Sequence, residues 1–110
     1  MRGIQSVCVR IIAESTLRRF AARHPEAAPG LAGWRRIMRR EQFRHFADLR
    51  RCFRSADQVR VASDKAVVVC NIHGNNYRLI CALHYNTGKV FLLRFLTHAE
   101  YSKDRWKDEL

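Results

Sequence analysis

The amino-acid sequence predicts an α+β domain in which N-terminal helices pack on one face of a small, mainly antiparallel, twisted sheet. Three observations lead to this prediction. The chain has 110 residues, which is enough for one hydrophobic core and a single domain spanning residues 1–110. Its first half spaces apolar residues as helices do. Its second half holds apolar, β-branched stretches separated by turn residues.

The N-terminal region predicts a strand followed by a short helix. Residues 7–13 are β-branched and apolar, which favours a strand. Ser15 is the expected N-cap of the helix, which should end at His24 because Pro25 disfavours the α conformation of the residue before it. The apolar face of this helix consists of Leu17, Phe20 and Ala21.

A second helix is predicted to begin between Pro25 and Pro29 and to end near Arg40. Its buried positions should be Leu31, Trp34 and Met38. Its opposite side carries Arg35, Arg36, Arg39 and Arg40. Residues 43–53 then indicate a loop and a short helix.

The second half predicts three strands. These strands span residues 66–72, 77–85 and 89–97. Gly74-Asn75 is typical of a hairpin turn, and residues 86–88 form a second turn signal. The polar segment 97–110, anchored by Tyr101 and Trp106, should end in a partial helix.

Alternation along the strands places an arginine in an apolar setting on two of them. On residues 77–85, Arg78 shares a face with Ile80. On residues 89–97, the expected faces are Phe91, Leu93 and Phe95 on one side and Val90, Leu92, Arg94 and Leu96 on the other.

Arg78 and Arg94 each need a counter-charge or a solvated cleft, because a buried unpaired charge is costly. A structural ion pair with an acid such as Asp64 or Glu100 is one explanation for either arginine. Two such arginines on adjacent strands, in a chain with few acids, favour an anion site.

The charge balance predicts a polyanionic partner. The chain has 21 Lys+Arg and 10 Asp+Glu, for a formal net charge of +11 and a pI near 10.6. Nucleic acid is the commonest partner of such a domain, although a solvated helix face would give the same excess. No apolar run is long enough to span a bilayer, and the composition is not that of a disordered chain.

The chain is expected to be cytoplasmic and free of metal. Residues 1–13 lack the continuous apolar core of a secretory signal, so the terminal Lys-Asp-Glu-Leu is interpreted as a charged tail. Four cysteines, at positions 8, 52, 70 and 81, show no disulfide framework. Cys70-x-x-His73 and Cys81-x-x-His84 have the spacing of zinc ligands. On strands, however, residues three apart point to opposite faces, so neither a metal nor another cofactor is predicted.

Two motifs together resemble the HigB toxins, which belong to the RelE-like superfamily of bacterial toxin–antitoxin systems. These motifs are Asn-Ile-His-Gly-Asn-Asn-Tyr-Arg-Leu at 71–79 and Thr-His-Ala-Glu-Tyr at 97–101. The similarity covers roughly residues 8–105 and includes the turn at 85–90. Cys70 stands where the family usually has Phe, and residues 1–7 extend beyond the family's usual start as an N-terminal extension.

The resemblance implies a RelE-like fold and a ribonuclease that cuts mRNA, typically on the translating ribosome, until a helix-turn-helix, HigA-like antitoxin neutralises it. Attack of a ribose 2′-OH on the adjacent phosphate needs cations, a base and an acid. Arg78 and Arg94 suit the phosphate, and His98 and Tyr101 suit proton transfer. Lys65 would add a further phosphate contact.

A non-catalytic RNA- or ribosome-binding module is the alternative function. It would contact phosphates without cleaving RNA, through Arg78, Arg94 and the four arginines of the second helix, Arg35, Arg36, Arg39 and Arg40. A sequence-specific DNA regulator is disfavoured, because the chain has no helix-turn-helix pattern of its own.

Overall fold

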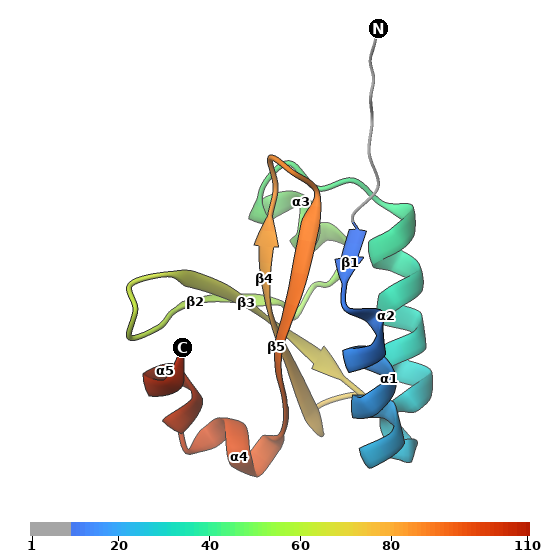
Figure 1. Ribbon diagram of the computed structural model, residues 1–110, viewed down its shortest axis with the longest axis vertical. Helices are drawn as coiled ribbons and strands as arrows, with labels where there is room; N and C mark the ends of the chain where they lie inside the picture. Colours follow the sequence, from blue (N-terminus) through green and yellow to red (C-terminus); the bar gives the residue numbers. More distant parts are fainter. Residues whose placement is uncertain (1–9) are drawn as a thin grey trace, which may run out of the picture.

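The structure is a computed structural model that describes residues 10–110, and it contains one five-stranded sheet in the order β1-β5-β4-β3-β2 (Figure 1). The strands are β1 (Arg10–Ile12), β2 (Asp57–Arg60), β3 (Ala66–Ile72), β4 (Tyr77–His84) and β5 (Lys89–Thr97). The helices are α1 (Glu14–Arg23), η2 (Pro25–Ala27), α2 (Ala28–Arg40), α3 (Phe46–Cys52), α4 (His98–Ser102) and α5 (Arg105–Glu109). Only β1 pairs in parallel, with β5, and the other strand pairs are antiparallel. The predicted α+β class is confirmed.

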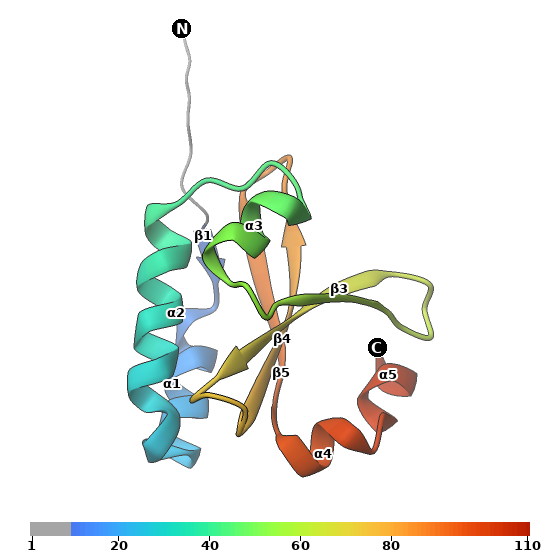
Figure 2. The same ribbon diagram turned by 180° about the vertical axis from the view of Figure 1, so that it is seen from behind.

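The larger hydrophobic core lies between the sheet and the helices that precede β2. Helices α1 and α2 run side by side along one side of the sheet (Figures 1 and 2). The predicted apolar face of α2 is confirmed, since Leu31, Trp34 and Met38 are all buried. They belong to one cluster with Leu79 and Cys81 of β4. Helix periodicity therefore predicted how α2 packs.

The opposite face of the sheet carries a second, smaller core under the C-terminal helices. Trp106 of α5 packs there with Val67, Val69 and Ile80 from β3 and β4. The β2–β3 hairpin projects from the sheet on the same side as α4 and α5 (Figure 1). The predicted partial helix after residue 97 is thus two short helices, and they position the C-terminal residues against the strands.

Three predicted boundaries differ from the structure. The first strand includes Arg10–Ile12, and residues 7–9 of the prediction lie outside the described residues. Ser15 is not the N-cap of α1, because the chain turns at Ala13 (φ 62°) and the helix begins at Glu14. Strand β2 was not predicted, since Asp57–Arg60 is a short, mostly exposed edge strand with little apolar alternation.

The predicted faces of β5 hold on each side of Leu93 but not across it, because the strand contains a β-bulge there. Arg94 pairs with Ile80 and Leu92 pairs with Cys81, so Leu93 has no opposite residue. The extra residue reverses the alternation. Phe95 therefore joins the core under the N-terminal helices, whereas Leu93 packs in the core under the C-terminal helices.

Two glycines of α2 should respond oppositely to alanine. A Cβ on Gly30 would lie 3.0 Å from Ile72 Cγ2 and 3.2 Å from the backbone nitrogen of His73, whereas a Cβ on Gly33 meets nothing within 4 Å. Gly30→Ala should lower the free energy of unfolding by about 1–2 kcal/mol, because a buried β-branched side chain and a strand end would have to move. Gly33→Ala should raise it by up to about 1 kcal/mol through helix propensity.

Urea denaturation of both variants beside the wild type measures this difference. A gain in stability from Gly30→Ala that matches the gain from Gly33→Ala would contradict a tight contact between α2 and the end of β3.

Candidate active site

The sheet face under α4 and α5 brings Arg78 and Arg94 together. Arg78 lies on β4 opposite Leu96, and Arg94 lies on β5 opposite Ile80. The two arginines are therefore diagonal neighbours across one strand pair, and their side chains leave the same face of the sheet. The bulge at Leu93 sets the register that places Arg94 beside Ile80.

Arg78 is a buried arginine with no carboxylate partner in the described part of the chain. Its side chain donates to the carbonyl oxygen of Asn75 (2.9 Å), the Oδ1 of Asn75 (2.7 Å) and the carbonyl oxygen of Tyr77 (3.2 Å). The whole residue is only 9% exposed. These neutral acceptors orient the guanidinium but do not cancel its charge. Arg78 is thus fixed, desolvated and positively charged, as a binding group for an oxyanion should be.

Arg94 is half-buried and more loosely held. Its Nη1 donates to the carbonyl oxygen of Leu93 (2.8 Å), and its Nε lies 3.5 Å from Glu109 Oε1. The Glu109 side chain is 59% exposed, so this ion pair contributes little. The two acids considered as partners from the sequence are engaged elsewhere: Asp64 pairs with Arg60, and Glu100 caps α4.

Tyr101 contacts both Arg78 and the C-terminal helix. The Arg78 guanidinium lies 5.2 Å from the Tyr101 ring centroid, and the same ring stacks on Trp106 at 5.3 Å. The indole nitrogen of Trp106 donates to the carbonyl oxygen of Tyr101 at 3.1 Å. The Tyr101 hydroxyl makes no hydrogen bond to any described residue. Tyr101 is therefore held in place while its hydroxyl stays available to a ligand.

His98 is exposed at the first position of α4. Thr97 and Glu100 form a capping box that fixes the start of this helix. The His98 backbone nitrogen donates to the carbonyl oxygen of Asn76 at 2.9 Å, which ties the helix to the β3–β4 turn. Within residues 10–110, the His98 ring makes no hydrogen bond, ion pair or aromatic contact, and the residue is exposed. The structure thus joins Arg78 to Tyr101 directly and leaves the His98 ring in solvent.

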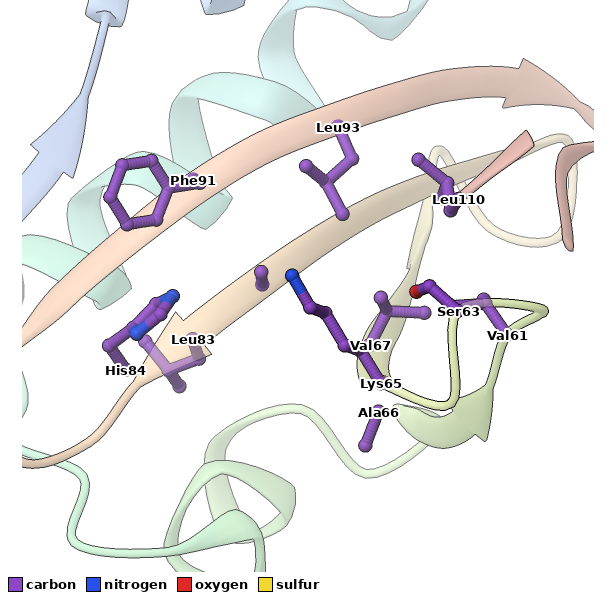
Figure 3. Close-up of a pocket in the computed structure, with 11 residues that line it drawn as sticks. Val61, Ser63, Lys65, Ala66, Val67, Leu83, His84, Phe91, Leu93 and Leu110 are labelled. Carbon is purple, nitrogen blue, oxygen red and sulfur yellow. The ribbon is translucent and has the colours of Figure 1, made fainter.

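Lys65 lies in a separate recess on the same side of the sheet (Figure 3). It follows the β2–β3 turn and extends toward Leu93, while His84 and Phe91 stand at the other end of the recess. Neither Arg78 nor Arg94 lines this recess. The sequence alone predicts no functional role for Asn75, Trp106 or Phe91, because their contacts to this face depend on how distant segments of the chain pack together.

The four arginines of α2 form a basic surface on the outer side of the helix layer. They surround one shallow hollow, which is lined by Ala32, Arg35, Arg36, Arg39 and Arg40. Arg35 and Arg39 pair with Glu14 of α1 at 2.5 and 3.6 Å, and the hydrogen bond from Arg35 holds the pKa of Glu14 below its usual value. Arg36 has no partner among the described residues. Because α2 covers the other face of the sheet, this surface is distinct from the Arg78–Arg94 site.

The zinc-like spacing does not gather ligands. Cys70 and Cys81 are buried in the core under the N-terminal helices, whereas His73 and His84 are exposed. A hydrogen bond between the thiols, together with burial, raises the pKa of Cys81 well above its usual value. In residues 10–110, no group of three or more His, Cys, Asp or Glu side chains could hold a metal ion.

A family model described as HigB_toxin, RelE-like toxic component of a toxin-antitoxin system, matches residues 27–104. The matched segment is more than half of the chain and contains Lys65, Arg78, Arg94, His98 and Tyr101. No curated protein matches the sequence. No helix in the described part of the chain is long and apolar enough to cross a membrane.

Proposed function

The chain belongs to the HigB family of RelE-like toxins, and on that premise we propose that it is an endoribonuclease that cuts mRNA on the translating ribosome. The observation that carries the proposal is the desolvated Arg78 guanidinium, which lacks a carboxylate partner among the described residues and lies beside Tyr101 and Arg94. A phosphodiester would supply the missing negative charge.

The proposed reaction is transesterification within the RNA. The ribose 2′-oxygen attacks the adjacent phosphorus, a new P–O2′ bond forms, and the bond from phosphorus to the 5′-oxygen breaks. The products are a 2′,3′-cyclic phosphate and a 5′-hydroxyl end, and no metal enters the scheme. Arg78 and Arg94 would bind the non-bridging oxygens as charge builds on them in the transition state.

Proton transfer is assigned to Tyr101 and His98. The 2′-hydroxyl must lose a proton and the departing 5′-oxygen must gain one. Tyr101 is in contact with Arg78, so its hydroxyl is near the proposed phosphate position. His98 follows Thr97 directly at the start of α4, and its exposed ring is available to a bound RNA.

The basic surface of α2 supports a second candidate function, which is RNA or ribosome binding without cleavage. Arg35, Arg36, Arg39 and Arg40 lie on a different face from Arg78, so they could contact ribosomal RNA phosphates whether or not the chain cuts mRNA. In the leading proposal this surface docks the toxin while the Arg78–Arg94 site acts on the message.

The partner of a toxin in such a system is an antitoxin. We propose a helix-turn-helix, HigA-like antitoxin whose acidic segment complements the toxin's positive charge and masks the Arg78–Arg94 site. The two proteins would act together in the bacterial cytoplasm. A structure of the complex that leaves Arg78 and Arg94 fully open would contradict masking of the site.

Mapping new RNA 5′ ends after induced expression in a bacterial host tests the function. We expect growth arrest and new 5′-hydroxyl ends inside translated messages, which ligate to an adaptor only after phosphorylation by a polynucleotide kinase. Arrest without new ends would favour the binding module. New ends that carry a 5′-phosphate would contradict the attack by the 2′-oxygen.

A further inference from the structure

The recess that contains Lys65 lies beside the Arg78–Arg94 site and has the size of a ligand pocket. It measures about 550 Å³, and Figure 3 shows its walls: the β2–β3 turn, the end of β4, the start of β5 and Leu110. Pockets of a few hundred Å³ are typical of small-ligand sites. None of the lining side chains is a carboxylate, and the polar ones belong to Ser63, Lys65 and His84. The charged side chain that a ligand meets there is therefore the cation of Lys65.

Phe91 presents an aromatic ring in this pocket. Its exposed fraction is 36%, and within residues 10–110 no other large hydrophobic residue is exposed. The His84 ring packs against it at 5.1 Å with the two planes 76° apart, which restrains the phenyl group. An exposed, restrained aromatic ring is the usual stacking platform for a base of single-stranded nucleic acid.

Lys65 supplies the charge. Its side chain extends from the turn into the middle of the pocket, between Leu83 and Leu93 (Figure 3). No described residue pairs with its ammonium group. The pocket thus combines an apolar floor, an aromatic ring and one unpaired cation, which together match a base and the phosphate attached to it.

The pocket adjoins the Arg78–Arg94 site. The β-bulge puts Leu93, which lines the pocket, and Arg94 on the same face of β5. The C-terminal residues make the same connection, because Glu109 pairs with Arg94 while Leu110 lines the pocket. A chain with a phosphate at Arg94 could therefore place a neighbouring nucleotide in the pocket.

We propose that this pocket binds one base of the RNA substrate, stacked on Phe91, with Lys65 on the adjoining phosphate. The proposal rests on the ribonuclease function and adds to it a subsite for one nucleotide beside the scissile phosphate. If one subsite holds one base, removing the base at a single position of the RNA should weaken binding. Removing a base at any other position should have little effect.

Abasic scanning tests the subsite by binding rather than by cleavage. A fluorescently labelled, single-stranded 12-nucleotide RNA is prepared with one abasic ribose at each position in turn, and its affinity is measured by anisotropy. In the wild type, one abasic position should weaken binding by about 10-fold or more. In Phe91→Ala, the intact RNA should bind about that much more weakly, and the same abasic position should have no further effect.

Matched variants separate stacking from folding and from general charge. Phe91→Tyr keeps an aromatic ring and should retain the abasic effect, whereas Phe91→Leu keeps apolar bulk and should lose it. Lys65→Gln should reduce the slope of log affinity against log salt concentration by the equivalent of about one phosphate contact. Arg23→Gln is the control for surface charge and should leave this slope unchanged. An equal reduction in Arg23→Gln would mean that a positive charge anywhere on the surface has the same effect. Thermal melting of each variant verifies that it is folded.

The binding experiment tests the base subsite independently of the ribonuclease function. RNA cleavage in cells with no abasic effect, or with an abasic effect that persists in Phe91→Ala, overturns the subsite and leaves the nuclease standing. A Phe91-dependent abasic effect without cleavage supports the subsite and removes the nuclease. Unchanged RNA affinity in Phe91→Ala would mean that the pocket takes something other than a base, such as an apolar side chain of a protein partner.

Discussion

Arg94→Ala should reduce RNA cleavage by roughly 100- to 1,000-fold while the protein stays folded, because it removes one transition-state contact to the phosphate. Arg94 is half-buried, and its exposed ion pair with Glu109 contributes little to stability. The melting temperature should therefore change little. The rate is measured as the appearance of cut message in a reconstituted translation system, by primer extension.

Glu109→Gln is the matched control for this variant. It removes the carboxylate that pairs with Arg94 but keeps the arginine. If Arg94 serves the phosphate, Glu109→Gln should cleave at least as fast as the wild type, since the guanidinium no longer has a competing anion. If the arginine serves only to hold α5, both variants should lose activity alike.

Arg94→Lys refines the same test. Lysine keeps the positive charge but lacks the planar fork that holds two phosphate oxygens at once. We expect activity between the levels of the wild type and of Arg94→Ala. Full activity in Arg94→Lys would mean that a point charge is sufficient at this position, and that a two-point contact to the phosphate is not required.

The elements that local sequence patterns determine were predictable. The 3.6-residue period of α2 identified Leu31, Trp34 and Met38 as buried, and the structure confirms all three. The apolar runs of β3, β4 and β5 were equally clear, with the turn at Gly74 between the first two. These signals depend on residues near one another in the chain, so no knowledge of the tertiary fold is required to use them.

The features that could not be predicted from the sequence depend on how distant segments of the chain pack together. The bulge at Leu93 is an extra residue in β5 relative to its paired strand β4, and no residue type in β5 predicts it. It reversed the predicted face of Phe95. Strand β2 is short and exposed, so alternation could not reveal it, and it forms by pairing with β3.

The candidate site was predictable in part. Strand alternation identified Arg78 and Arg94 as arginines in apolar surroundings. Their role was inferred from the chemistry of phosphate transfer and from the family resemblance. The structure adds what spacing could not: the amide of Asn75 as the acceptor for Arg78, and Trp106 as the ring that holds Tyr101. Both contacts depend on the tertiary fold.

Arg78→Met should abolish cleavage without destabilising the protein. A buried arginine without an acid partner pays the cost of desolvation, and a well-packed apolar side chain of similar length can replace such a charge at little or no cost. The acceptors that Arg78 would leave belong mainly to Asn75, which is exposed and can bind water instead. We expect the free energy of unfolding to stay within about 1 kcal/mol of the wild type or to exceed it, measured by urea denaturation.

Asn75→Asp tests the same idea without removing the arginine. The Oδ1 of Asn75 already lies 2.7 Å from an Arg78 nitrogen, so a carboxylate at this position would pair with the guanidinium and neutralise it. Stability should rise while cleavage falls by about 10-fold or more, because the phosphate must then compete with a resident anion. A variant that gains stability and keeps full activity would show that the unpaired charge of Arg78 is not needed for catalysis. If Arg78→Met were instead to unfold the protein, the arginine would have a structural role in joining the β3–β4 turn to α4.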